Sequence, residues 1–591
     1  MKSVYEPLTW LVGGEAGYGI TTMGQMFARA CARGGLNVFG YVEYPSLIRG
    51  GHNTAMIRTA VDTVHAHSDK IDIMLALNKE TIDLHVNEMA EGGVIIYDGE
   101  GIPLDAAKYP NLKLVSVPMA RITKELNVDR VMRNTVALGA SFAIMGLGFA
   151  PVENVLNTTF ERKGPEVVAH NVNVAKTGFD YVMKDIKEPF KKTVAIVPNA
   201  SKRMVISGNE AIALGALKAG VKFMAAYPMT PATAIMLMIA KYGVKHNIVM
   251  KHSEDEIAAV NMAIGAAHMG VRSMTATAGG GFSLMVEALG MAGITETPLV
   301  VVEGMRPGPS TGLPTWTDQA DLRFLMHASQ GEFPRVVFLP GDVTESFEMT
   351  LKAFNTAEKY QMLCMILTDK YLGESVQSVE PFTQEYKVDR GLLMTMDEAA
   401  ALKPGKYKRF EFTESGVSKR TRPGFPNTIF AVSTDEHKED GDLDESSENR
   451  TKMVDKRAKK LMTLKKEYLS DVEMCELHGP TNADLTLVGW GSTKGPILEA
   501  VDVANSNGLK VNFLQIKIAL PFPTEAVTKF LGAAKKITLV ENNSEAQMGG
   551  VIRQYTGIEI MDKLLRYDGR PFNPAEILVK INSILKAGVN L

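Results

Sequence analysis

The chain has 591 residues, of which 45% are hydrophobic and 22% are charged, and its formal net charge is −3. A chain of this length is too long to fold around one hydrophobic core, so we expect several domains. Because the composition is not basic, nucleic acid is excluded as an expected partner.

The N-terminus and the cysteines bear on the compartment. Residues 1–10 lack the basic-then-apolar pattern of a signal peptide. The longest uncharged stretch, 136–152, is shorter than the ~20 apolar residues of a membrane-spanning helix. Cys31, Cys364 and Cys475 lie too far apart in the sequence to suggest a zinc or iron–sulfur ligand set. We therefore expect a protein of the reducing cytoplasm with no membrane contact, and any iron–sulfur cluster on another chain.

The first 190 residues alternate segments typical of strands and helices, which predicts a mostly parallel α/β sheet. A glycine-rich loop at 13–19 follows the first strand and precedes a helix at 21–33. A linker rich in lysine and proline is expected at 184–202. The predicted strands are 9–12, 37–42, 71–76, 93–97 and 112–117.

The glycine loop stands where a phosphate-binding loop would lie. Its glycines are Gly14, Gly17 and Gly19, and Arg49 follows in a second glycine-rich segment. Together they could bind an anionic group such as a coenzyme diphosphate. The spacing is not G-x-G-x-x-G, so the nicotinamide dinucleotide motif is incomplete. Glycines needed only for backbone geometry remain the alternative.

Two further α/β units follow, separated by a charged stretch. Acidic residues dominate 435–448 and basic residues dominate 450–466, which is typical of a solvated surface segment followed by a charged helix. The second unit has predicted strands at 221–226, 273–277, 299–303, 335–339 and 362–367, and the third at 484–488, 510–516 and 536–540.

A turn at the end of the 221–226 strand presents a small hydroxyl group. Pro228 and Pro231 punctuate it, and helical spacing follows at 232–241. Thr230 is therefore expected at the helix N-cap, with Pro231 at the first helical position. Amide groups and the helix dipole there suit a ligand carboxylate or phosphate. A well-capped helix without a ligand is the alternative.

Glu256 opens a helix whose next residues are nearly all small, so its carboxyl group is expected to point into a tightly packed interior. Thiamine diphosphate chemistry needs such a carboxyl group beside the pyrimidine ring. Gly279, Gly280 and Gly281 are expected in a loop that a planar ring approaches closely. Arg306, in a rigid loop without an adjacent acid, is expected to hold a carboxylate in a bidentate manner.

These motifs carry a family resemblance. YPMTPAT (227–233), EDEIAAVNMAIGAA (254–267), TATAGGGFSLMVEALG (275–290) and GMRPGPSTGLPT (304–315) resemble the alpha subunit of 2-oxoacid:ferredoxin oxidoreductases. The chain is most similar to the 2-oxoglutarate type with an N-terminally fused gamma domain. GGEAGYGI and RGGHN resemble that gamma domain, DEHKEDG with ENRTKMVDKR resembles the charged linker, and LVGWGSTKGPILEA, ALPFP and VENNSEAQMGG resemble a transketolase-C-like domain.

The resemblance implies three α/β domains and a role for each motif. The implied boundaries are 1–190 for the gamma domain, 203–372 for the thiamine pyrimidine-binding domain, 373–480 for the charged linker and 481–591 for the transketolase-C-like domain. Glu256 is the implied catalytic residue at the pyrimidine, preferred over Glu254 for its distance to Gly265. The implied substrate-binding residues are Thr230 and Arg306, the implied cofactor-binding residues are Tyr227, Pro228, Gly279, Gly280 and Gly281, and the implied coenzyme A residues are Gly14, Gly17, Gly19 and Arg49.

The chain also lacks part of the expected site. No Gly-Asp-Gly motif for the diphosphate and magnesium occurs anywhere in the sequence. A beta subunit is therefore expected to supply Mg²⁺, the diphosphate ligands and a [4Fe-4S] cluster, with thiamine diphosphate shared at the interface of a heterodimer or dimer of heterodimers. The implied reaction converts a 2-oxoacid and coenzyme A into CO₂ and an acyl-CoA, with electrons passed to ferredoxin.

Two departures from the family pattern leave the substrate open. Met229 replaces a frequent isoleucine, and the glycine loop reads AGGG where SGPG is common. Pyruvate, branched-chain or aryl 2-oxoacids are alternatives to 2-oxoglutarate. A dinucleotide-binding electron-transfer subunit and a non-catalytic scaffold are the alternatives from other classes.

Overall fold

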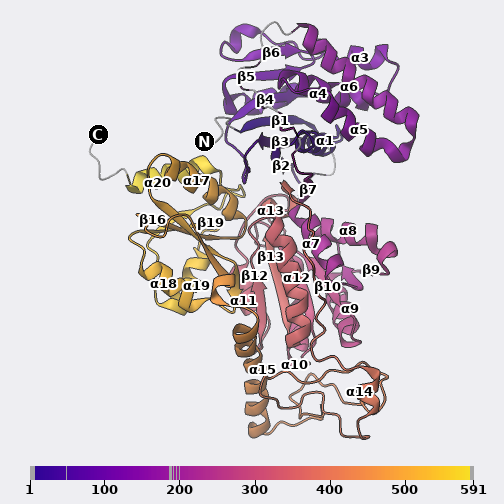
Figure 1. The fold of residues 1–591 in the computed structure, drawn as a ribbon, viewed down its shortest axis with the longest axis vertical. Coiled ribbons are helices and arrows are strands. Elements are labelled where there is room, and N and C mark those ends of the chain that lie inside the picture. The colour runs from indigo at the N-terminus through magenta and orange to yellow at the C-terminus, as the bar shows by residue number, and fades with distance from the viewer. Residues whose placement is uncertain are drawn as a thin grey trace. The chain divides into compact units, whose positions relative to one another are not determined.

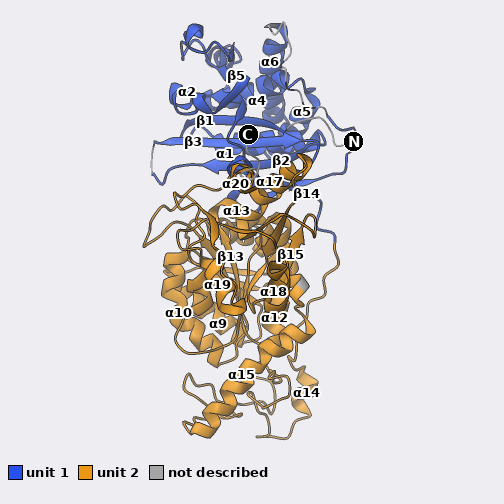
Figure 2. Cartoon of the chain, turned by 90° about the vertical axis from the view of Figure 1, so that its left-hand side faces the viewer, with its two compact units in different colours: residues 1–207, 374–383, 573–577 blue, residues 208–373, 384–572, 578–591 orange. Residues whose placement is uncertain are grey.

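The computed structural model describes residues 7–47, 50–185, 190, 192, 194, 196–198 and 200–585. The chain divides into two compact units, coloured separately in Figure 2. Unit 1 comprises Met1–Ser207, Glu374–Thr383 and Asn573–Ile577, and unit 2 comprises Gly208–Gly373, Gln384–Phe572 and Leu578–Leu591. Within the described residues the strands form three sheets, and helices pack against them (Figure 1), which confirms the α/β class.

The sheet described in unit 1 has the strand order β6-β5-β4-β1-β3-β2-β14-β7. Only β6, β5, β4 and β1 run parallel, and the other pairs are antiparallel. The prediction of a mostly parallel sheet is therefore wrong for half of it, because it missed β3. The strands are β1 (Leu8–Glu15), β2 (Asn37–Glu43), β3 (His52–Ala60), β4 (Ile71–Ala76), β5 (Met89–Tyr97), β6 (Lys113–Ser116), β7 (Met204–Ser207) and β14 (Val376–Val379).

Both faces of this sheet are covered. Trp10 and Val12 of β1 belong to the core beneath α1, α4, α5 and α6, whereas Leu11 belongs to the core that Ile82 of α2 completes. This alternation follows from the two-residue repeat of a strand. The helix after β1, α1, thus covers one face of the sheet, and the helix after β4, α2, covers the other. The helices are α1 (Ile20–Arg33), α2 (Lys79–His85), α3 (Met119–Glu125), α4 (Arg133–Ile144), α5 (Ala150–Phe160) and α6 (Pro165–Asp185).

The larger sheet of unit 2 has the order β18-β12-β13-β11-β10-β8-β9, and every pair except β12–β18 is parallel. Its central strands are apolar and buried, as expected of strands covered on both faces. The five strands predicted here are found within two residues of the expected positions. The strands are β8 (Phe223–Ala226), β9 (Val249–His252), β10 (Ser273–Thr277), β11 (Leu299–Met305), β12 (Arg335–Phe338), β13 (Leu363–Asp369) and β18 (Ile518–Leu520).

Helices join these strands, and a third sheet ends the fold. The helices of this part are α7 (Gly208–Lys218), α8 (Thr233–Gly243), α9 (Glu256–His268), α10 (Gly279–Ile294), α11 (Leu322–His327), α12 (Val343–Tyr360) and α13 (Lys370–Glu374). The third sheet contains β15 (Cys475–His478), β17 (Val511–Ile516), β16 (Leu485–Trp490), β19 (Ile537–Glu541) and β20 (Asp562–Leu565), in that spatial order. The associated helices are α16 (Asp471–Met474), α17 (Lys494–Ser506), α18 (Thr524–Gly532) and α19 (Gln547–Thr556), and α20 (Pro574–Leu585) is divided between the two units.

The charged stretch between these sheets contains α14 (Met396–Ala400) and α15 (Ser447–Glu467). The acidic residues of 435–448 lie mostly at the surface, as expected. The basic helix differs from the expectation, because α15 buries Lys456 and Lys460 beside the buried Glu296. Although burial opposes ionisation, the two ammonium groups lower the pKa of Glu296. Glu296, distant in the sequence, thus neutralises lysine charges that were expected to face solvent.

Candidate active site

Four motifs of unit 2 converge at the carboxyl ends of neighbouring parallel strands. The Thr230 turn follows β8, Glu256 follows β9, the triple glycine follows β10 and Arg306 follows β11. In an open α/β sheet this edge is where ligands bind. The sheet order therefore brings together residues that are as much as 76 positions apart, as the Thr230–Arg306 contact demonstrates.

Two side chains hold the Thr230 turn by hydrogen bonds to its backbone. Arg306 Nη1 donates a hydrogen bond to the Thr230 carbonyl oxygen at 2.8 Å, and Asn209 Nδ2 donates to the Pro231 carbonyl oxygen at 2.9 Å. The predicted N-cap role of Thr230 is wrong, because α8 begins at Thr233 and its N-cap is Ala232. The helix therefore begins two residues later than the sequence suggested, after both prolines of the turn. Thr230 remains half-buried beside Arg306.

Glu256 opens α9, as expected. Asp255 is the N-cap residue and accepts a hydrogen bond from the Ala258 amide at 2.7 Å. The Glu256 side chain is 3% exposed, and its Oε1 atom has no hydrogen-bond partner among the described residues. A buried carboxyl oxygen without a partner is costly unless a ligand satisfies it. Glu254, two residues earlier, is exposed to solvent.

The triple glycine forms the first turn of α10 rather than the predicted loop, since Gly279 is already helical and Ala278 is the N-cap. A Cβ atom at Gly281 would lie 2.6 Å from Glu256 Oε1 and 2.1 Å from Thr277 Oγ1. Neither distance is sterically allowed. Glycine is therefore required at 281 to leave room for Glu256, a reason that the sequence did not reveal. At Gly280 the nearest such atom is the Ser310 carbonyl oxygen at 4.0 Å.

Arg306 is half-buried, and burial lowers its pKa while Glu303 opposes that effect. The expectation that no acid lies near Arg306 is therefore wrong. Glu303 is fully buried on β11, and its carboxyl group lies within hydrogen-bonding reach of the Asp321 carboxyl group. Burial, with Asp321 and Asp369 nearby, raises the pKa of Glu303 well above its usual range. Burial and these acids therefore favour the protonated, neutral form of Glu303 over the ionised form.

Asp321 is a second acid that the sequence reasoning missed. Burial raises the pKa of Asp321 to about 6. Its Oδ2 atom lies 2.5 Å from the position of a Cβ atom at Gly279, so it borders the start of α10. The signal that could have found it is its position as the N-cap residue of the short helix α11.

Tyr227 and Pro228 lie at the outer part of the same turn. Tyr227 is 39% exposed, and its ring centroid lies 6.2 Å from that of His252 at the end of β9. Among the described residues no group of three histidine, cysteine or acidic side chains is arranged to hold a metal ion. The described part of the chain likewise has no helix long and apolar enough to cross a bilayer.

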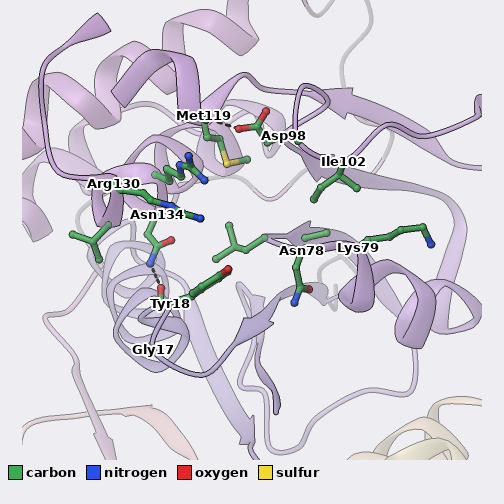
Figure 3. A pocket seen from close by; sticks show the side chains of 15 residues that line it. Gly17, Tyr18, Asn78, Lys79, Asp98, Ile102, Met119, Arg130 and Asn134 are labelled. Atoms are coloured by element: carbon green, nitrogen blue, oxygen red, sulfur yellow. Dashed lines mark hydrogen bonds between the residues drawn. The ribbon is translucent and has the colours of Figure 1, made fainter. Parts of the chain in front are cut away.

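Unit 1 contains a separate cavity of about 690 Å³ at the carboxyl ends of its parallel strands (Figure 3). Gly17 and Tyr18 after β1 and Leu77 to Lys79 after β4 form part of its wall. The chain turns to opposite faces after these two adjacent strands. Such a topological switch point is the usual ligand site of an open α/β sheet.

The predicted glycine loop contributes only part of this cavity. Gly17 lines it, Gly19 is the N-cap of α1, and Gly14 belongs to β1 opposite Asn53. Arg49 lies outside the described residues. The predicted loop at 13–19 is therefore shorter than expected, because pairing with β3 extends β1 to Glu15.

Basic side chains missed by the sequence reasoning complete the wall. Arg130 comes from the turn just before α4, Arg133 begins α4 and Lys79 begins α2. The Nε atom of Arg133 is buried without a hydrogen-bond partner among the described residues. The Asn134 side chain donates to the Tyr18 carbonyl oxygen and thereby holds the glycine loop (Figure 3). The cavity therefore combines a glycine-containing loop with three basic side chains and one acidic side chain, Asp98.

Family models match three parts of the chain. Residues 214–456 match "pyruvate flavodoxin/ferredoxin oxidoreductase, thiamine diP-bdg", residues 9–181 match "pyruvate ferredoxin/flavodoxin oxidoreductase" and residues 483–577 match "pyruvate:ferredoxin oxidoreductase core domain II". The first match contains all four motifs at the edge of the larger sheet, and the second contains the cavity of unit 1.

Whole-chain relatives agree with these matches. The alpha subunit of a 2-oxoacid:ferredoxin oxidoreductase from Saccharolobus solfataricus is 33% identical over 98% of both chains. The 2-oxoglutarate synthase subunit KorA from Methanothermobacter thermautotrophicus is 34% identical, covering 64% of this chain and 98% of that protein. The solved structure of a 2-oxoglutarate:ferredoxin oxidoreductase from Magnetococcus marinus, with 2-oxoglutarate, coenzyme A and succinyl-CoA bound, matches with a TM-score of 0.90 at 32% identity, covering 98% of this chain and 99% of that one. The chain therefore belongs to the 2-oxoacid:ferredoxin oxidoreductases, as an alpha subunit of this family of enzymes.

Proposed function

We propose that this subunit oxidatively decarboxylates 2-oxoglutarate to succinyl-CoA, with thiamine diphosphate at the edge of its larger sheet. Support for the substrate comes from the 2-oxoglutarate bound by the Magnetococcus marinus relative. The chain then acts in the cytoplasm, together with a beta subunit and ferredoxin. We propose the same three functional domains and charged linker that the sequence predicts.

The observation that carries this proposal is the unsatisfied carboxyl group of Glu256. Its buried Oε1 atom has no hydrogen-bond partner among the described residues, and glycine at 281 leaves room for the Glu256 side chain, so the carboxyl group fits a hydrogen bond with a nitrogen of the pyrimidine ring. When bound, thiamine diphosphate supplies the carbon nucleophile and the electron sink for loss of CO₂ from a 2-oxoacid. Glu256 would hydrogen-bond the pyrimidine nitrogen, and Tyr227, Pro228 and the triple glycine would enclose the ring.

Arg306 and Thr230 would hold the carboxylate of the substrate. Arg306 Nη1 donates to the Thr230 carbonyl oxygen, which orients the guanidinium group, and its remaining N–H groups are available for a carboxylate. The Thr230 hydroxyl group comes from the same turn. The two residues thus form one anion-binding unit although they lie on different loops.

Exchanging Arg306 for lysine is expected to raise the KM for the 2-oxoacid about tenfold, because lysine retains the charge but loses the paired N–H geometry. Steady-state kinetics of the complex with its beta subunit measure this KM. The KM for coenzyme A should stay the same. An unchanged KM for the 2-oxoacid in both Arg306→Lys and Arg306→Ala would assign this anion-binding role to other residues.

A beta subunit would complete the active site. The sequence has no Gly-Asp-Gly motif, and we propose that the partner supplies Mg²⁺ and a [4Fe-4S] cluster. Ile257, on the first turn of α9 after Glu256, is 49% exposed, and Leu284, on the second turn of α10 after Gly281, is 51% exposed. Apolar side chains exposed at the rim of a site favour coverage by a partner. The expected assembly is a heterodimer or a dimer of heterodimers.

We propose that coenzyme A binds unit 1 at the cavity that Gly17 and Tyr18 border. Lys79, Arg130 and Arg133 would face its phosphate groups. Gly19 would help to shape the loop as the N-cap of α1, while Gly14 would act only through the strand that supports it. A role for Arg49 stays part of the proposal.

Exchanging Arg133 for glutamine is expected to raise the KM for coenzyme A about fivefold to tenfold, since one charge-assisted contact to phosphate is lost. Arg162→Gln is the matched control, because Arg162 is exposed and lies outside the residues that line the cavity. Steady-state kinetics at several salt concentrations measure the KM for coenzyme A. The difference in KM between Arg133→Gln and wild type should shrink at high salt, because salt screens the attraction between Arg133 and phosphate. Equal KM values in Arg133→Gln and Arg162→Gln would contradict the coenzyme A site.

One assay separates the alternative substrates. The chain purified with its beta subunit is supplied with 2-oxoglutarate, pyruvate, a branched-chain 2-oxoacid or an aryl 2-oxoacid, and acyl-CoA formation is measured. The highest kcat/KM is expected for 2-oxoglutarate. A higher kcat/KM for another 2-oxoacid would identify that acid as the preferred substrate. If none of the four acids gave acyl-CoA, a dinucleotide-binding electron-transfer subunit or a scaffold would be favoured.

A further inference from the structure

The smaller sheet of unit 2 contacts the loop that carries Arg306. This loop, residues 306–321, connects β11 to α11 and is called here the Arg306 loop. No helix or strand is described within residues 306–321, so the contacts that hold this loop come from other parts of the chain. The contacts come from three short segments of the C-terminal part of unit 2, at the end of β16, after β19 and after β20.

Gln319 anchors the end of the Arg306 loop. Its side-chain Nε2 donates to the Trp490 carbonyl oxygen at 2.9 Å, and its Oε1 accepts from the Asn542 amide at 3.0 Å. The Gln319 backbone amide donates to the Asn542 carbonyl oxygen at 2.7 Å, and its carbonyl accepts from Asn543 Nδ2 at 3.1 Å. Gln319 is fully buried. All its main polar groups are thus satisfied by the ends of β16 and β19.

Arg570 and Gly569 hold the middle of the loop. The guanidinium carbon of Arg570 lies 3.2 Å from the centroid of the Trp316 ring, and the Thr317 amide donates to the Gly569 carbonyl oxygen at 3.1 Å. A guanidinium group stacked on an indole ring is attracted to its electron-rich face. Asp568 Oδ1 accepts from the Arg570 amide at 2.9 Å and fixes this turn.

These contacts extend to the residue next to Arg306. The Leu313 amide donates to the Pro307 carbonyl oxygen at 2.9 Å, so the loop closes on itself just after Arg306. A Cβ atom at Gly569 would lie 3.2 Å from Leu313, 3.3 Å from Trp316 and 3.7 Å from Pro307. The turn at Gly569 therefore packs against both the closed segment and its base.

We propose that Arg570 is a positioning residue for the substrate carboxylate, acting through Trp316 and the Arg306 loop. This inference rests on the proposed function of Arg306. Without the stack, the loop would spend less time in the geometry that presents Arg306 to the substrate. The apparent affinity for the 2-oxoacid falls by the fraction of time lost, whereas the rate at saturation is retained. The C-terminal domain thus gains a role in substrate binding, although none of its residues needs to touch the substrate.

The stack of Arg570 on Trp316 is called here the clamp, and hydrogen exchange on the chain alone tests whether it holds the Arg306 loop, without cofactor or partner. Peptides covering 307–321 should exchange faster in Arg570→Ala and Trp316→Ala than in wild type. Arg553→Ala is the matched control, since Arg553 is exposed on the same domain and pairs only with Glu559 at 3.1 Å among the contacts described. Trp316→Phe should restore protection, because it keeps an aromatic face beneath the guanidinium. Unchanged exchange in Arg570→Ala would overturn the proposal.

Kinetics of the complex with its beta subunit test the link to Arg306. Arg570→Ala should raise the KM for the 2-oxoacid about fivefold and change kcat less than about twofold, with thermal stability like that of Arg553→Ala. In an Arg306→Ala background, Arg570→Ala should add less than about twofold, because it acts through the missing guanidinium. Multiplying effects would refute the positioning role. If Arg306→Ala alone left KM unchanged, the proposed function would fail while the exchange result would still judge the clamp.

Discussion

Glu256→Gln is expected to lower kcat for 2-oxoacid decarboxylation by about 10²- to 10⁴-fold, the range of a lost proton-transfer contribution. Glutamine retains the volume of the buried side chain but replaces an oxygen that can hold a proton by an amide. Glu256 is 3% exposed, so water has little access to substitute for the carboxyl group. Release of CO₂ by the complex at saturating thiamine diphosphate and 2-oxoacid measures kcat.

Glu254→Gln provides the matched control, because Glu254 lies two residues earlier and is exposed. It should retain activity within about twofold, as expected of an exposed side chain. Binding of thiamine diphosphate, followed by its circular dichroism, adds a readout that does not depend on turnover. Full activity of both Glu256→Gln and Glu256→Ala would exclude Glu256 as the pyrimidine ligand, and loss in Glu254→Gln instead would move the role to that residue.

Gly281→Ala is expected to reduce activity about 100-fold and to destabilise the protein by about 1–3 kcal/mol, the usual cost of overpacking a tight interior. The added methyl group would lie 2.6 Å from Glu256 Oε1 and 2.1 Å from Thr277 Oγ1. Either the start of α10 or the Glu256 side chain must move, and both border the proposed cofactor position. Activity is measured with the partner, and stability by thermal unfolding of the chain.

The opposite result is expected from Gly265→Ala in the neighbouring helix α9. A Cβ atom at Gly265 meets no atom within 4 Å. Alanine is the better helix former by about 1 kcal/mol, so this variant should be slightly more stable and fully active. The comparison separates helix propensity from steric conflict. Equal activity and stability of Gly281→Ala and Gly265→Ala would mean that the close approach of Gly281 to Glu256 is not needed for function.

The strands of the larger sheet could be predicted closely because they are covered on both faces. Such strands are nearly continuous apolar runs, and the segment 273–277 coincides with β10. In unit 1 the polar sequence of β3 (His52–Ala60) concealed a strand, although its inner residues are buried. Its pairing with β1 and β2 depends on partners that no local pattern specifies, and this changed the sheet from parallel to mixed.

The active-site motifs could likewise be found in the sequence, but their geometry could not. Glu256 opens its helix as predicted, because Asp255 provides a local N-cap. Thr230 does not cap α8, and the triple glycine is helical, since these outcomes depend on packing around the turns. The approach of Glu303 to Arg306 was missed because the direction of a side chain at a strand end is set by the surrounding fold.

The sequence by itself determined the α/β class, the chemistry-bearing motifs at the strand ends and the missing diphosphate motif that predicts a partner. Each of these depends on residues that are neighbours in the sequence. Only the tertiary structure decided why residue 281 is glycine, which basic side chains line the cavity of unit 1, and that Arg570 stacks on Trp316. Those features are contacts between distant segments, and their geometry is set by the packing of sheets and loops rather than by local propensity.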